Sequence, residues 1–87
     1  MQNNAFDELN VRITSGEHKG LYVATRIGGA DSGATQPSDA CIAIGKNHWL
    51  MVREKGLPFN RTVAQKAMTD LRIVGVDSEL VSRGKTL

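Results

Sequence analysis

The sequence has one cysteine, Cys41, and no apolar run that approaches the ~20 residues of a membrane-spanning helix. A lone cysteine forms no intramolecular disulfide and no multi-cysteine metal cluster. The segment 1–8 has no basic stretch leading into an apolar one, so we expect no secretory signal. Together these absences indicate an intracellular, cytoplasmic protein without a membrane segment.

Side chains suited to catalysis are also scarce. The histidines are His18 and His48, and the carboxylates are scattered singly rather than paired for acid–base work. Cys41 and His48 could face each other across a hairpin as a thiolate–imidazole pair, yet no third group is placed to orient the histidine. Adding His18 and Asp39 to this pair gives no spacing typical of a metal site. We therefore predict no catalytic residue, no metal site and no cofactor, and so not an enzyme; an active site completed only in an oligomer stays an alternative.

The chain of 87 residues is long enough for one small domain, and we expect residues 1–8 and 84–87 to be frayed. A domain of this size buries only about 60–65% of the surface that its unfolded chain exposes, so self-association would add stability. The eleven Lys and Arg residues are spread along the chain, and the net charge is +2. This charge permits nucleic-acid binding without requiring it.

Residues 9–27 have the pattern of two strands joined by a polar turn. Leu9, Val11 and Ile13 alternate with polar residues, which is the period of a half-buried strand. In the second strand the alternation places three residues on the buried face, Leu21, Val23 and Ile27, and three on the other face, Tyr22, Ala24 and Arg26.

The chain beyond this hairpin predicts a second hairpin and a helix. Residues 40–44 and 49–54 alternate in the same way around a short turn. An apolar stripe at helical spacing follows over residues 60–71, with Asn60 suited to the N-cap. Between the hairpins, residues 28–38 are rich in Gly, Ser and Asp and predict an exposed, mobile loop.

The segment after the helix has two interpretations. Residues 72–76 are rich in β-branched side chains and indicate a fifth strand, which we favour. Asp77 could instead cap a final helical turn over residues 78–83. We therefore expect an α+β domain whose antiparallel sheet has four or five strands, in two hairpins, with one helix near 60–71 packed on one face.

Residues 11–21, Val-Arg-Ile-Thr-Ser-Gly-Glu-His-Lys-Gly-Leu, resemble the KOW motif of small SH3-like barrels in ribosomal proteins and transcription elongation factors. The shared features are an alternating strand, a glycine at the turn and a Lys-Gly pair that starts the next strand. Val23 stands where that family usually has a further glycine, and the loop 28–38 is foreign to a compact KOW unit. The resemblance implies a nucleic-acid-binding module.

Residues 74–83 resemble the turn and recognition helix of a helix-turn-helix repressor, in which a glycine lies in the turn and the second helix enters the major groove. The preceding helix departs from that family, because Asp70 stands where the motif has an apolar residue and Leu71 where it has a small one. This resemblance implies DNA binding by residues 74–83.

Alternation also predicts which side chains the sheet presents to solvent. If the aliphatic residues of both hairpins are buried, the opposite face carries Arg12, Tyr22, Arg26, Trp49 and Arg53, together with Met51. Arginine interleaved with Tyr and Trp suits a protein interface, and equally suits base stacking with phosphate contact. In the alternative interpretation, Trp49 and Met51 lie in the core beneath the helix and the arginines are ordinary surface residues.

We therefore expect a small, non-catalytic interaction module, a regulator or inhibitor of the kind that phages and mobile elements often encode. Its partner would be a protein, or a second copy of the chain, bound through this sheet face. The alternative is a basic nucleic-acid-binding module of the SH3-like or helix-turn-helix type.

Overall fold

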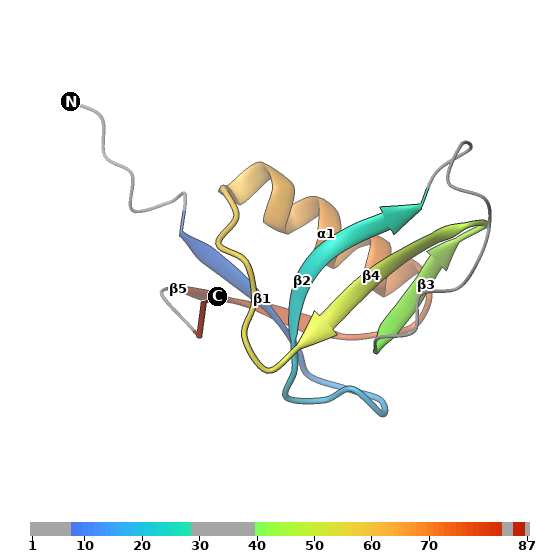
Figure 1. The fold of residues 1–87 in the computed structure, drawn as a ribbon, viewed down its shortest axis with the longest axis horizontal. Helices are drawn as coiled ribbons and strands as arrows, with labels where there is room; N and C mark the ends of the chain where they lie inside the picture. The colour runs from blue at the N-terminus through green and yellow to red at the C-terminus, as the bar shows by residue number, and fades with distance from the viewer. Residues whose placement is uncertain (1–7, 29–39, 83–84, 87) are drawn as a thin grey trace.

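The chain folds into an antiparallel sheet with a helix on one of its faces (Figure 1). The structure is a computed structural model and describes residues 8–28, 40–82 and 85–86. In chain order its elements are β1 (Leu9–Ile13), β2 (Tyr22–Gly28), β3 (Cys41–Gly45), β4 (His48–Arg53), α1 (Arg61–Ile73) and β5 (Ser78–Ser82). The five strands lie in the order β3-β4-β2-β1-β5. The predicted α+β class, both hairpins and the helix are confirmed.

The sheet is open, because β3 and β5 form its two edges, and it does not close into a barrel of the SH3-like type. Among the described residues, no helix combines the length and the hydrophobicity that crossing a membrane requires. The predicted mobile loop and the predicted frayed ends lie outside the described residues, apart from Glu8, Gly28, Lys85 and Thr86.

The start of α1 follows the sequence prediction. Asn60 is the N-cap, and its side-chain Oδ1 accepts a hydrogen bond of 2.8 Å from the backbone N–H of Val63. This bond satisfies one of the N–H groups that the first helical turn leaves without a partner. Ala64, Ala67 and Leu71 then form the buried stripe of the helix, which faces the sheet.

The end of α1 corrects the predicted fifth strand over residues 72–76. The helix continues to Ile73, and Gly75, with φ 84°, follows it in the left-handed region. The N–H of Gly75 donates to the carbonyl of Arg72, and the N–H of Val76 donates to that of Leu71. These two bonds form a Schellman motif, which ends a helix and releases the chain in a new direction.

The fifth strand is therefore β5, which begins at Ser78. It pairs with β1 without interruption, from Leu9 opposite Ser82 to Ile13 opposite Ser78. Because residues 78–82 are a strand, the recognition helix implied by the helix-turn-helix resemblance is not formed. The prediction of a strand after the helix was right about its existence and wrong about its position.

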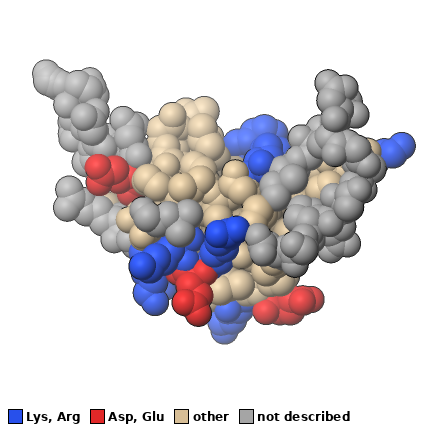
Figure 2. Space-filling model, in the orientation of Figure 1, with Lys and Arg blue, Asp and Glu red and all other residues tan. Residues whose placement is uncertain are grey.

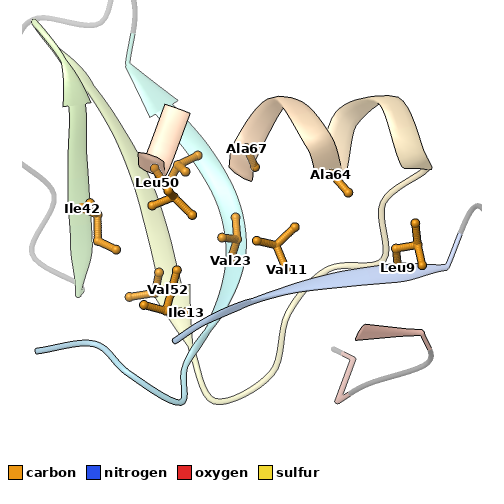
Figure 3. Packing of buried hydrophobic residues seen from close by; sticks show 10 residues of the cluster. Leu9, Val11, Ile13, Val23, Ile42, Leu50, Val52, Ala64 and Ala67 are labelled. Atoms are coloured by element: carbon orange, nitrogen blue, oxygen red, sulfur yellow. The ribbon is translucent and has the colours of Figure 1, made fainter. Parts of the chain in front are cut away.

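The core lies between α1 and the sheet (Figure 3). Its buried members are alternating aliphatic residues of the strands and the buried stripe of the helix: Leu9, Val11, Ile13, Val23, Ile42, Leu50, Val52, Ala64, Ala67 and Leu71. We call the side of the sheet that carries this core the helix face, and the other side the outer face.

The sheet divides into two arms, β5–β1 and β2–β4–β3. The strands β1 and β2 are paired at Arg12 and Tyr22 and diverge beyond that pair. The segment Gly56–Phe59, which leads from β4 to α1, fills the gap (Figure 1). Its Leu57 N–H donates to the carbonyl of Val23 in β2, and Phe59 exchanges two hydrogen bonds of 2.8 and 2.9 Å with Leu9 in β1. This segment completes the sheet where its own strands separate.

A shift of register in β2 reverses the alternation expected there. Val23 lies opposite Val52, but the next pair is Thr25 with Met51, so Ala24 is an extra residue, as in a β-bulge. Every side chain after a bulge changes face relative to a regular strand. Arg26 therefore lies on the helix face, opposite Leu50, and not on the outer face as predicted.

Candidate functional site

A row of four polar side chains crosses the outer face of the sheet. Arg12 of β1 lies opposite Glu79 of β5 on one side and opposite Tyr22 of β2 on the other. Tyr22 in turn lies opposite Arg53 of β4. Directly opposed residues of antiparallel strands share a face and lie in contact range. Four strands thus contribute one residue each to the row Glu79–Arg12–Tyr22–Arg53.

The Arg12 side chain is hydrogen-bonded to both of its neighbours in this row, Glu79 and Tyr22. Its Nη2 donates a hydrogen bond to Oε2 of Glu79, and the two side chains are 43% and 41% exposed. The hydrogen bond with Glu79, and after it the hydrogen bond with Tyr22, raises the pKa of the Arg12 guanidinium above its ordinary value. Arg12 is therefore an oriented, locally neutralised cation rather than a free one.

Tyr22 lies on the predicted face, but it is covered. The residue is 6% exposed, and Gly56 of the segment Gly56–Phe59 lies directly against its Cβ atom. Met51, which follows along the same face, is 7% exposed. A buried tyrosine orients Arg12 and offers no surface on which a base could stack.

Trp49 also lies on the outer face, as predicted. The strand β4 is regular, so Trp49, Met51 and Arg53 alternate onto the same side as Tyr22. Trp49 is half-buried and pairs with Ala43 of β3, while Arg53 is exposed. The interpretation that placed Trp49 and Met51 beneath the helix is wrong, because the helix covers the other face.

Arg26 is separated from these residues by the sheet. It forms an ion pair with Asp70 of α1, whose other carboxylate oxygen lies 3.5 Å from Nζ of Lys66. The Asp70 side chain is only 13% exposed. Arg26 therefore joins β2 to the helix, and the structure does not bring it together with Arg12, Tyr22, Trp49 and Arg53.

Two lysines that the sequence did not single out lie beside the basic end of this row. The N–H of Gly56 donates to the carbonyl of Lys85 at 2.9 Å, which places the exposed Lys55 and Lys85 next to one another. Arg53 precedes Lys55 by two residues, with the exposed Glu54 between them. Figure 2 shows Lys and Arg atoms gathered around Asp or Glu atoms on one side of the molecule. No local sequence pattern could reveal this proximity, because Lys55 and Lys85 are far apart in the sequence. The segment of Lys85 was moreover predicted to be frayed.

The cysteine–histidine pair considered from the sequence is not formed. Cys41 lies opposite Met51, whereas His48 lies opposite Gly45 at the other end of the hairpin. The Nδ1 atom of His48 is 2.9 Å from the carbonyl oxygen of Lys46. Within the described ranges no three His, Cys, Asp or Glu side chains gather as metal ligands would.

Comparison of the chain with protein-family models, with curated proteins and with solved structures found no match.

Proposed function

We propose that the chain is a small, non-catalytic interaction module, of the regulator or inhibitor type, that binds a protein partner through the outer face of its sheet. The observation that carries this proposal is the placement of Trp49 and Arg53 on the same side of β4, away from the helix. Trp and Arg are the residue types most enriched at the energetic centres of protein interfaces. A regular strand holds the two side chains at a fixed separation, so a partner meets a preorganised surface.

The electrostatics of the row favour a protein partner over a single-stranded nucleic acid. Glu79 contributes a carboxylate beside Arg12, which lowers the positive charge that phosphates would meet. Tyr22 is buried, so within the described ranges it adds no second aromatic platform beside Trp49 on this face. Mixed charge around one large aromatic residue is the composition of an interface core with a polar rim.

The experiment is affinity capture from the cell that produces the protein, with the tagged chain as bait and a parallel nuclease treatment. We expect Arg53→Glu and Trp49→Ala to lose the partner that the unchanged chain retains, with or without nuclease. Arg72→Glu, an equal change of charge on α1, is the matched control and should retain it. Circular dichroism of each variant establishes that the fold persists. Equal retention by Arg53→Glu, Trp49→Ala and the unchanged chain would contradict the proposal.

Nucleic-acid binding is a second candidate, and the proximity of the exposed Lys55 and Lys85 to one another, just after β4, is the observation that favours it. Clustered cations that contact phosphates give an affinity that falls steeply with salt. If this candidate is right, a filter-binding titration should show such a dependence, and Lys55→Gln with Lys85→Gln should reduce its slope by about 1 for each lost contact. Absence of retention of any DNA or RNA at low salt would exclude it.

A further inference from the structure

The edge of β5 that faces away from β1 is available for pairing with another strand. On its inner side β5 pairs with β1 through five consecutive residue pairs without a shift of register. Among the described residues no strand pairs with the other side, since β5 ends the sheet. The opposite edge, β3, differs, because a register shift between Ala43 and Gly45 interrupts it. A bulge blunts an edge against strand addition, and a regular edge is a template for it.

A groove runs beside this regular edge, between β5 and α1. Its volume is about 460 Å³, and its apolar wall consists of Met68, Val76 and Leu80. Leu80 lies opposite Val11, so its side chain is on the helix face and is only partly covered by the core. A strand added to β5 would place alternate side chains over this groove.

We propose that a second copy of the chain occupies this edge, with β5 pairing antiparallel to the β5 of the partner about a two-fold axis at Leu80. In this register Leu80 lies opposite the partner's Leu80, and both leucines enter the joined grooves. Ser78 lies opposite the partner's Ser82, on the same face. The apolar wall of the groove favours an apolar residue in the added strand, and β5 itself, Ser-Glu-Leu-Val-Ser, offers Leu80 there with a small serine two residues to either side.

Charge and packing favour this register over the two registers that are shifted by one residue. An axis at Glu79 would place two carboxylates directly opposite one another, which destabilises a strand pair. An axis at Val81 would set Leu80 against a serine and remove the leucine pair from the groove. With the axis at Leu80, Glu79 faces the partner's Val81, and its charge is already compensated by Arg12 of its own chain. The edge is thus self-complementary in one register.

This dimer goes beyond the proposed function and leaves its surface accessible. The strand β5 ends one arm of the sheet, whereas Trp49 and Arg53 lie on β4 in the other arm. An isologous contact of two edges would therefore join two sheets and present two outer faces. Loss of the dimer and loss of partner capture are separate results, because they depend on different strands.

The first test uses disulfide formation as a measure of register, in a Cys41→Ser background. Ser78→Cys together with Ser82→Cys should give a covalent dimer of twice the 9.4 kDa chain mass under mild oxidation, because each cysteine meets its counterpart on the other copy. Each single substitution is the matched control and should stay monomeric on a non-reducing gel. Equal cross-linking by either single variant would overturn the register, and no cross-linking by the double variant would overturn the dimer.

The second test measures the equilibrium by sedimentation. The unchanged chain should shift from monomer to dimer as its concentration rises. Ser78→Lys with Ser82→Lys places like charges opposite each other twice and should raise the dissociation constant about tenfold, whereas Ser78→Lys with Ser82→Glu should not. Both variants substitute the same two serines and share Ser78→Lys, and circular dichroism of each variant checks that the fold persists. A monomer at every concentration, or equal dissociation constants for the two variants, would refute the proposal.

Discussion

Gly56 lies directly against Tyr22: a Cβ atom added to Gly56 would be 2.8 Å from the Cβ of Tyr22 and 2.9 Å from the carbonyl oxygen of Val23. Glycine is therefore the residue that lets the segment after β4 approach β2 this closely. The segment Gly56–Phe59 bonds to both β1 and β2 where these strands diverge. Gly56 also lies against the base of Tyr22, a residue that is 6% exposed although the sequence placed it on an accessible surface.

The contact predicts the effect of Gly56→Ala. The added methyl group meets backbone and Cβ atoms that cannot rotate away, so we expect a loss of about 1–3 kcal/mol in the free energy of unfolding. Urea denaturation monitored by the fluorescence of Trp49 measures it. Gly45→Ala is the control, since its nearest neighbour would be His48 Cβ at 3.8 Å. Equal stability of the two variants would show that the segment Gly56–Phe59 is not packed closely against Tyr22.

A second prediction concerns Asn10, which is 0% exposed. Its Nδ2 donates to the carbonyl of Leu57 at 3.1 Å, while its Oδ1 has no hydrogen-bond partner in the described structure. In Asn10→Asp, burial would raise the pKa of the new carboxyl group above its value in the unfolded chain. The variant should therefore be closest to the unchanged protein in stability below about pH 4, and the deficit should grow as the pH rises through the raised pKa.

Urea midpoints at several pH values measure this deficit relative to the unchanged protein. Asn10→Ala is the control, because it removes the same hydrogen bond and introduces no titrating group. Its deficit should not vary with pH. A deficit of Asn10→Asp that is constant from pH 4 to about pH 8 would contradict the buried position of residue 10.

The N-cap gives a third prediction. Asn60→Ala removes the side-chain acceptor of the Val63 N–H and should lower the free energy of unfolding by about 1 kcal/mol. Asn60→Ser keeps an oxygen at this position and should retain most of that stability. Thermal denaturation followed by circular dichroism compares the two variants. If alanine and serine were equivalent at residue 60, the cap would contribute nothing to the helix.

The position of Arg26 gives a fourth prediction. Its side chain is 42% exposed, so Arg26→Gln should cost less than about 1 kcal/mol of stability. Arg26→Glu should cost more, because it places a carboxylate beside the largely covered Asp70. Added salt should reduce that extra cost by screening the repulsion. Both variants should keep any partner bound at Trp49 and Arg53, since residue 26 lies on the other face.

A denaturation series at low and high salt checks this prediction, and the same two variants enter the capture experiment. If Arg26→Glu were as stable as Arg26→Gln at low salt, residue 26 would not lie beside Asp70. If either variant released the partner while remaining folded, residue 26 would belong to the binding surface after all.

Most of the fold followed from local patterns, and the parts that did not have identifiable causes. The hairpins and α1 were predictable because alternation and helical spacing are properties of neighbouring residues. The strand expected at 72–76 was misplaced because Gly75 ends the helix through hydrogen bonds to residues already inside it. The candidate site was predicted in part: Arg12, Tyr22, Trp49 and Arg53 share the outer face, whereas Arg26 does not.

The sequence by itself determined the α+β class, the buried aliphatic stripes and the cap at Asn60, because each depends on residues a few positions apart. Only the tertiary structure decided which side chains of the outer face are accessible. The extra residue at Ala24 moves Arg26 to the helix face, and Gly56, more than thirty residues after Tyr22, packs against the Cβ of the buried tyrosine. Both effects come from contacts between segments that are distant in the sequence. Such contacts form only in the completed sheet, and they produce no periodic pattern of residues from which they could be predicted.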